Sequence, residues 1–356
     1  MEASEFPQRL YTKGGEPLPD KSISYYAGDY RLVPSLRQAL REDGWADIYE
    51  SLLGVLLKFH DLDFGWASRL VHHMLTFQIV CNQRYELQSL IVTTPVRFSL
   101  HEFEEITGLN CGYVNDLALA DLEISDDMRV FREQMGVNME LGPSTFEIIE
   151  ACSNCSSWSR DDRLRLRYLG IYAGFIVATE TISPKNANHA RLVVDLEGFK
   201  EFPWGRIAFK HLIKSVKEKD LSKNINIEGF VQALQVWVYY ALPDFAAEFG
   251  EPLPNDPNPL LSYKGSRGRK NVKANMLKHC CVAKDLADMF PVWDDEQHHP
   301  KIFKVVNAIH DPQFNCEKQI KLLSDKVEAV EHAVEELTTG TAKHTDEEVK
   351  DNVEPS

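Results

Sequence analysis

This chain of 356 residues has few cysteines, no excess of basic charge and no long apolar runs. Its 7 cysteines are scattered and odd in number, at positions 81, 111, 152, 155, 280, 281 and 316. Residues 1–20 are polar and interrupted by Pro and Gly, without the apolar core of a secretory signal. Few, scattered cysteines without such a signal are typical of thiols that stay reduced. We therefore expect an intracellular protein without a disulfide framework.

Apolar segments of membrane length and phosphate-binding motifs are also missing. The longest nearly apolar stretch, Gly170–Ala178, is far shorter than the ~20 residues that cross a bilayer. Neither Gly-x-x-x-x-Gly-Lys-Ser/Thr nor Gly-x-Gly-x-x-Gly occurs. We therefore expect no membrane partner and no nucleotide cofactor.

Acidic residues dominate the charge of the chain. Asp and Glu total 54 and Lys and Arg total 39, which gives a formal net charge of −15. Because nucleic acid is itself a polyanion, this charge opposes broad nonspecific binding to it, although a local basic patch could still contact phosphates. The 44% of hydrophobic residues are enough to form a large core without disulfides or metals.

Apolar residues recur at helical spacing through most of the chain, which predicts a mainly α fold with a small β-hairpin as a minor α+β component. Helical patterns cover about 33–59 with a break at Gly44, 66–80, 159–182, 209–216 and 230–242. The apolar stripes extend to Val80 in the second of these and to Ile182 in the third.

The best-specified local unit is a hairpin followed by a capped helix. Residues 85–92 and 96–98 are rich in bulky apolar side chains, and a Thr-Thr-Pro turn separates them. Ser99 and Glu102 then have the spacing of a capping box, in which the serine hydroxyl and the glutamate carboxylate satisfy each other's backbone amides. Gly108 is a suitable left-handed stop for this helix.

Composition predicts five segments. They are a disordered N-terminus (1–28), a main domain (29–248), a Pro-rich and then basic linker (249–275), a helical segment with a short coiled coil (276–338) and a disordered tail (339–356). The linker prediction rests on four prolines within 252–259, which disfavour regular structure.

A basic run within the linker is a candidate nucleic-acid contact or nuclear-import signal. It comprises Lys264, Arg267, Arg269, Lys270 and Lys273. The Arg-Gly-Arg sequence within it resembles arginine hooks that enter A·T-rich minor grooves. A plain solvated linker is the favoured interpretation, because charge runs usually are solvated. Binding to nucleic acid is therefore an alternative that we do not favour.

Residues 320–337 carry a heptad seam. Its members, spaced 3, 4, 3, 4 and 3 apart, are Ile320, Leu323, Val327, Val330, Val334 and Leu337. This spacing predicts either a weak homodimer or a helix that packs on its own domain. The seam spans about 2.5 heptads, whereas three to four usually mark a stable coiled coil.

Several motifs together resemble one known family. They are Phe64-Gly65, Arg84–Leu87, Val96–Phe103, Thr107–Gly112, Phe202–Phe209 and Ala233–Gln235. In this order they resemble a plant domain of unknown function that occurs in Mutator-like transposon proteins, where it commonly precedes a cysteine protease domain similar to the SUMO proteases. The resemblance covers roughly residues 30–245, and the protease domain is absent here. It implies a mobile-element origin and a nuclear setting, but no established activity.

No candidate for catalysis or metal binding has the required pattern. Cys316 lacks the Asp-Cys-Gly context that the protease family requires, and Cys111 has that context only in part. Cys152 and Cys155 form one Cys-x-x-Cys pair, but zinc usually needs a second tight pair, which His279–Cys281 does not supply. We therefore expect no catalytic residue, no metal and no cofactor.

Four residues in the family-like motifs are candidate interaction residues: Arg97, His101, Trp204 and Arg206. The alternative for the two arginines, which we favour, is a paired or snorkelling side chain that locks the hairpin to the helices. The leading hypothesis for the chain is a non-catalytic protein-interaction module of plant transposon origin with an unknown partner. The alternatives are an accessory domain of a SUMO-protease-like peptidase and a weak DNA-associated factor acting through 264–273.

Overall fold

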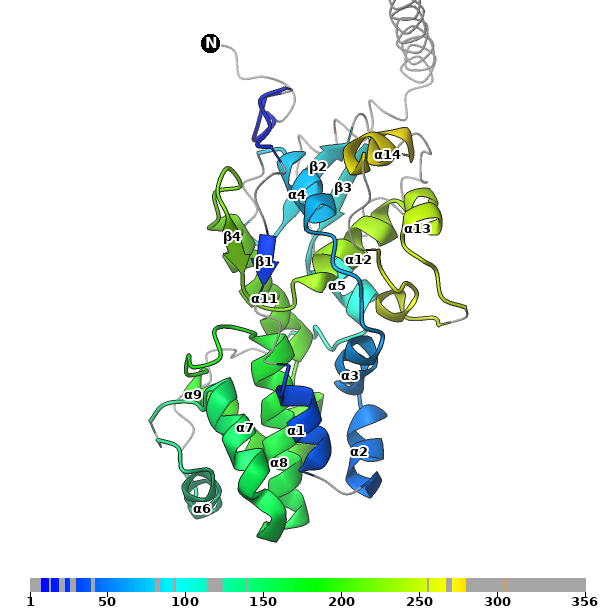
Figure 1. Ribbon diagram of the computed structural model, residues 1–356. Coiled ribbons are helices and arrows are strands. Elements are labelled where there is room, and N and C mark those ends of the chain that lie inside the picture. Colours follow the sequence, from blue (N-terminus) through cyan, green and yellow to red (C-terminus); the bar gives the residue numbers. More distant parts are fainter. Residues whose placement is uncertain are drawn as a thin grey trace, which may run out of the picture. The chain divides into compact units, whose positions relative to one another are not determined.

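Figure 1 shows a computed structural model of the chain, which divides into two compact units, Met1–Gln297 and His298–Ser356. The structure describes residues 8–12, 14–18, 23–25, 30–39, 42–80, 84–91, 94–113, 124–138, 140–254, 256–266, 271–279 and 304. All of these except Lys304 belong to the first unit. The heptad seam at 320–337 and the basic residues Arg267, Arg269 and Lys270 lie outside the described residues.

The prediction of a mainly α fold with minor β structure is confirmed. The helices described are α1 (Leu32–Gln38), α2 (Glu42–Tyr49), α3 (Gly54–Asp61), α4 (Ser68–Thr76), α5 (Leu100–Thr107), α6 (Asp126–Met135), α7 (Thr145–Asn154), α8 (Arg160–Ile171), α9 (Ala187–Arg191), α10 (Leu196–Glu201), α11 (Trp204–Lys217), α12 (Gln232–Ala241), α13 (Pro243–Phe249) and α14 (Val272–His279). The strands are β1 (Ile23–Tyr25), β2 (Leu87–Ile91), β3 (Thr94–Phe98) and β4 (Ile225–Ile227). Within the described residues, no helix combines the length and apolar character that crossing a membrane would need.

Two groups of helices meet through α11. In the first group α12 packs against α4, α5 and α13, and in the second α1 packs against α7 and α8. The helix α11 contacts α5 of the first group and also the π-helical turn Tyr172–Ile176, which continues α8 of the second. Figure 1 shows α11 between α5 and the α7–α8 pair.

The second group is packed so closely that two glycines are required. The π-helical turn and α8 lie against α1, and a Cβ at Gly170 or Gly174 would lie 2.5 Å from Leu36 Cδ2 or 2.3 Å from Leu32 Cδ2. The helix predicted to continue to Ile182 ends with this turn instead, and Ile182 is 70% exposed. Likewise α4 ends at Thr76 rather than near residue 80, because residues 78–80 leave it to pair with other strands.

The predicted hairpin is confirmed and belongs to a wider antiparallel arrangement. β2 pairs with β3 in a register that places Leu87 opposite Phe98. On its other side β2 is bridged by Gln78 to Ser89, and Ile79 is bridged in turn by Arg9. In addition β1 pairs in parallel with β4. Within 1–28, residues 8–10 and β1 are thus paired with distant segments of the chain.

The segment predicted as a linker packs on the core where it is described. Leu260 is fully buried within a single 3₁₀ turn, Pro259–Leu261. Asn258 Nδ2 donates to the Thr107 carbonyl at the end of α5 (3.3 Å), and Gly65 N donates to Lys264 O (2.9 Å). The prolines do exclude a long regular element, but burial of Leu260 and these hydrogen bonds hold the irregular backbone in place.

The capping box at the start of α5 is confirmed, and its carboxylate also binds a buried arginine. Glu102 Oε2 accepts from the Ser99 amide (2.7 Å) and hydroxyl (2.5 Å), and Glu102 Oε1 lies 2.8 Å from the Arg97 Nη2. The Arg97 carbonyl accepts from Trp237 Nε1 of α12 (2.7 Å). One carboxylate therefore joins the end of the hairpin to α5, next to the point where α12 attaches.

We expect Glu102→Gln to destabilise the protein by about 3 kcal/mol, because the amide keeps the cap but leaves the buried Arg97 charge without an ionic partner. The matched control is Glu147→Gln. Glu147 forms the same capping box with Ser144, but in the described part of the chain no arginine lies within ion-pairing distance of it, and its charge acts on the buried Arg132 only at longer range. The control should cost less than about 1 kcal/mol. Urea unfolding of both variants measures the difference, and equal losses would contradict the role assigned to the ion pair.

Candidate functional site

The four candidate interaction residues fall into two places. Arg97 and Trp204 lie in the core, where Arg97 binds Glu102 and Trp204 Nε1 donates to the Phe199 carbonyl (2.6 Å). His101, in the first turn of α5, is half-buried. Arg206, also half-buried, donates through Nε to the carbonyls of Cys111 (3.0 Å) and Gly112 (3.1 Å). Arg97 and Trp204 therefore present no surface to a partner.

These contacts bring two of the family-like motifs, Thr107–Gly112 and Phe202–Phe209, together. Gly205 N donates to Asn110 O (2.9 Å), and Asn110 Nδ2 donates back to Glu201 O (2.6 Å). A Cβ at Gly205 would lie 2.5 Å from Cys111 Sγ and 2.9 Å from Asn110 O. Only a glycine permits this close approach, so the segment 107–112 fixes the start of α11.

A cavity of about 420 Å³ lies further along α11 and is strongly basic. We call it the basic cavity. Its wall is formed by the end of the π-helical turn, the loop 177–186, α9 and one face of α11. It is lined by Tyr172, Val177, Thr179, Pro184, Lys185, Asn186, His189, Ile207, Lys210, His211 and Lys214.

Lys185 is the most unusual residue of this wall. It is only 6% exposed, and its Nζ donates to Thr179 Oγ1. Among the described residues no carboxylate lies within ion-pairing distance of this amine. Burial lowers the pKa of Lys185 to about 8, and the Glu228 carboxylate offsets only part of that effect. A buried lysine is nearly always paired, so this one has an unfilled electrostatic requirement.

Two imidazoles complete the polar lining. Tyr172 Oη lies 3.1 Å from His189 Nδ1, and burial together with the Lys210 charge lowers the pKa of His189 to about 4. His211 Nε2 lies 3.6 Å from Glu228 Oε2, while burial lowers the pKa of His211. Near neutral pH His189 is uncharged, so the positive charge of the cavity comes from its lysines.

Helix geometry places two of those lysines together. Lys210 and Lys214 are four residues apart on α11, and positions with this spacing lie on one face of a helix. Both are exposed at the edge of the cavity. Lys185 was not predictable as a site residue, because a lysine in a Ser-Pro-Lys-Asn loop carries no periodicity that would indicate its burial.

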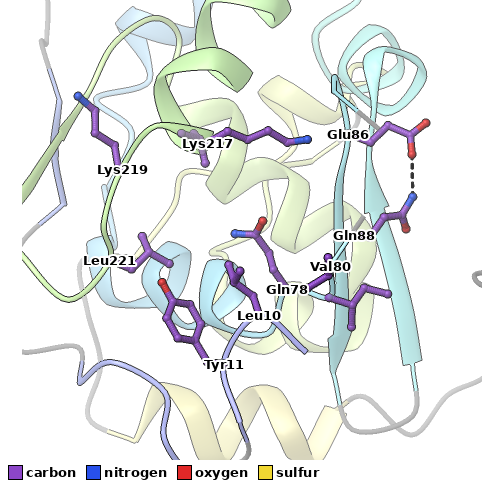
Figure 2. A pocket seen from close by; sticks show the side chains of 11 residues that line it. Leu10, Tyr11, Gln78, Val80, Glu86, Gln88, Lys217, Lys219 and Leu221 are labelled. Carbon is purple, nitrogen blue, oxygen red and sulfur yellow. Dashed lines mark hydrogen bonds between the residues drawn. The ribbon is translucent and has the colours of Figure 1, made fainter. Parts of the chain in front are cut away.

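A second cavity of about 240 Å³ has mixed charge (Figure 2). Gln88 Nε2 donates to Glu86 Oε2 (2.9 Å) along the edge of β2, and Lys217 extends across the cavity toward them. Tyr11 and Leu221 lie at the opposite end. Because acidic and basic groups face the same space, this cavity has no charge preference comparable to that of the basic cavity.

The described thiols are all buried. Burial raises the pKa of Cys152 to about 12, and burial together with the Glu104 carboxylate raises that of Cys111. Cys155 is also buried, and its Sγ donates to Cys152 O (3.2 Å). In the part of the chain that the structure describes, no three His, Cys, Asp or Glu side chains gather in a way that could hold a metal ion.

The basic run is described at only two of its positions. Lys264 is exposed, whereas Lys273 is partly neutralised, because its Nζ lies 3.8 Å from Glu16 Oε2 and 5.7 Å from the centre of the Phe77 ring.

The fold and cavity thus define a mainly helical domain with a basic cavity on α11. Residues 75–215 match the family model described as Domain of unknown function (DUF1985). The resemblance inferred from the sequence is confirmed at this level. Every residue that lines the basic cavity falls inside the matched segment. No curated protein and no solved structure matches the chain.

We expect Gly205→Ala to lower the free energy of unfolding by about 2 kcal/mol, because the new methyl group overlaps Cys111 and Asn110. Lys210→Ala on the same helix is the control and should change stability by less than about 0.5 kcal/mol. Urea unfolding checks both variants. An unchanged Gly205→Ala protein would show that the 107–112 segment does not fix α11.

Lys185 should weaken the fold in a pH-dependent way. Its pKa is near 10.5 in the unfolded chain and about 8 when folded. The unfolded state therefore binds the proton more tightly, and the destabilisation present at pH 7 disappears as the pH rises from about 8 to 10.5. We expect Lys185→Met to stabilise the protein at pH 7 by on the order of 2 kcal/mol, and by less at pH 10. Unfolding at both pH values, beside Lys210→Met, tests this, and a gain independent of pH would contradict it.

Proposed function

We propose that this chain is a non-catalytic protein-interaction module that binds an acidic segment of a partner protein in the basic cavity. One observation carries the proposal. Lys185 is buried and has no carboxylate partner among the described residues, at a cavity that Lys210 and Lys214 also line. A carboxylate from a partner would supply the missing ion pair, which compensates the cost of burying the charge.

The charge of the whole chain makes this cavity distinctive. With a net charge of −15, most of the surface repels an acidic partner, so a local concentration of lysines can select where such a partner docks. The raised pKa values of the described thiols support a role without a cysteine nucleophile.

An apolar rim beside the cavity supports a peptide as the ligand. Phe146 N donates to Thr181 O (3.0 Å), and Lys185 N donates to Pro143 O (3.3 Å), so the segment 141–146 runs alongside 181–185. On these two segments Leu141, Phe146 and Ile182 are all exposed. An acidic segment with neighbouring apolar side chains would fit both features.

By its resemblance, we propose that the module derives from a plant mobile element and works in the nucleus. The alternative role, as an accessory domain to a separate SUMO-protease-like peptidase, would use the same cavity to bind a substrate or the peptidase itself.

A fluorescein-labelled peptide with several glutamates followed by two leucines tests the docking site. Anisotropy at low salt should show binding to the full chain, and Lys210→Glu combined with Lys214→Glu should weaken it at least tenfold. The matched control, Lys217→Glu combined with Lys219→Glu, changes the charge equally at the end of α11 but outside the basic cavity. Equal weakening in both double variants, or no binding at all, would overturn the proposal.

A further inference from the structure

We propose that Lys185 forms a reversible imine with an aldehyde or ketone that carries an acidic group, which makes the basic cavity a carbonyl-binding site. The inference rests on the proposed function, because the same lysines would hold the acidic group of the ligand. Such a small ligand would occupy the space needed by an acidic segment and so displace it.

The position of the amine is the first reason. Lys185 lines the cavity, and the one hydrogen-bond partner of its amine in the described structure is the neutral hydroxyl of Thr179. By contrast, Lys58, Lys200, Lys223 and Lys273 each pair with a carboxylate. An amine attacks a carbonyl only when it is unprotonated, and an ion pair favours the protonated form.

The surroundings of Lys185 make the unprotonated form accessible. Burial of Lys185 disfavours the ammonium ion, and the Glu228 carboxylate offsets only part of that effect. With a pKa of about 8, roughly a quarter of the Lys185 amines are neutral at pH 7.5, whereas for an ordinary lysine the fraction is about a thousandth. His189 and Tyr172 also face the cavity, but both are neutral at this pH.

The reaction needs no oxidant or reductant. The nitrogen lone pair attacks the carbonyl carbon, a C–N bond forms, and the carbonyl π electrons move to oxygen. One proton passes from nitrogen to that oxygen and gives a carbinolamine. The C–O bond then breaks, and the hydroxyl leaves as water with the remaining nitrogen proton. The Thr179 hydroxyl, which is hydrogen-bonded to Nζ, is placed to relay these protons.

The size and charge of the cavity define the ligand. About 420 Å³ lies within the range of small-molecule sites. Lys210 and Lys214 at the edge would bind a carboxylate or phosphate, while the carbonyl group reaches Lys185 inside. The ligand class is therefore a small carboxylated or phosphorylated aldehyde or ketone.

The test uses pyridoxal 5′-phosphate as a probe that joins an aldehyde to a phosphate. The full chain is incubated with it at pH 7.5, reduced with borohydride, digested and mapped by mass spectrometry. Modification at Lys185 should exceed that at Lys210 and at Lys214 at least tenfold. Labelling spread evenly over the surface lysines would overturn the proposal, and this readout on the unaltered chain does not depend on any variant folding.

Two variants separate the amine from the anion-binding groups. Lys185→Arg keeps the charge but removes the nucleophile, and should abolish the selective label. Lys210→Gln with Lys214→Gln should slow labelling by pyridoxal 5′-phosphate at least fivefold and leave labelling by pyridoxal, which has no phosphate, within twofold. Equal slowing with both probes would contradict the division of roles.

Peptide binding and Lys185 labelling, measured side by side, distinguish this proposal from peptide docking. Acidic-peptide binding without selective Lys185 labelling would remove carbonyl binding and leave docking intact. Selective labelling by pyridoxal without peptide binding would support the amine chemistry and remove docking.

Discussion

The buried carboxylate of Glu102 is the constraint on which the rest of the main domain depends. It accepts hydrogen bonds from the amide and hydroxyl of Ser99 and pairs with Arg97. These contacts hold the end of β3 in one orientation relative to α5. The Arg97 carbonyl also accepts a hydrogen bond from Trp237 Nε1, so Arg97 helps to fix the position of α12. A buried ion pair contributes little net stability over an apolar contact, but loss of one partner is expensive. The pair therefore acts mainly by excluding other arrangements of β3, α5 and α12.

The helix α11 connects the junction of β3, α5 and α12 to the basic cavity. The rings of Phe98 and Phe103 lie 5.7 Å and 5.5 Å from the ring of Phe209, which lies one position before Lys210 on α11. At its other end the helix is fixed by Gly205 against Asn110. With both of these contacts in place α11 cannot turn freely about its axis, so Lys210 and Lys214 keep their orientation at the edge of the basic cavity. The family-like motifs thus build the framework, and the three lysines of the basic cavity lie between them in the sequence.

The features that were predictable from the sequence are those that depend on neighbours in the chain. The capping box of Ser99 and Glu102 involves residues three positions apart, so its spacing alone reveals it, and apolar periodicity similarly predicts the α class. Pairing of β1 with β4, the burial of Leu260 and the burial of Lys185 depend on contacts between distant segments, which local composition does not record. Arg97 is an intermediate case. Its neighbours in the sequence predict apolar surroundings, but only the folded structure shows that its side chain pairs with an internal carboxylate and not with a ligand.

Three cations are buried in the described part of the domain without a carboxylate in ion-pairing distance, and comparing them shows why Lys185 is the one suited to a ligand. Arg132 donates to the Leu141 carbonyl (2.9 Å), and Arg167 donates to the Arg37 carbonyl (3.2 Å) and lies over the Trp45 ring. Arg132 Nη2 and Arg167 Nε and Nη1 still have no hydrogen-bond partner in the described structure, but a guanidinium is delocalised and weakly hydrated, so its burial costs less than that of an ammonium. The compact ammonium of Lys185 is strongly hydrated in water, and Thr179 replaces only one of its three potential hydrogen bonds. Of the three, only Lys185 lines the basic cavity, where an incoming anion or carbonyl can meet that requirement.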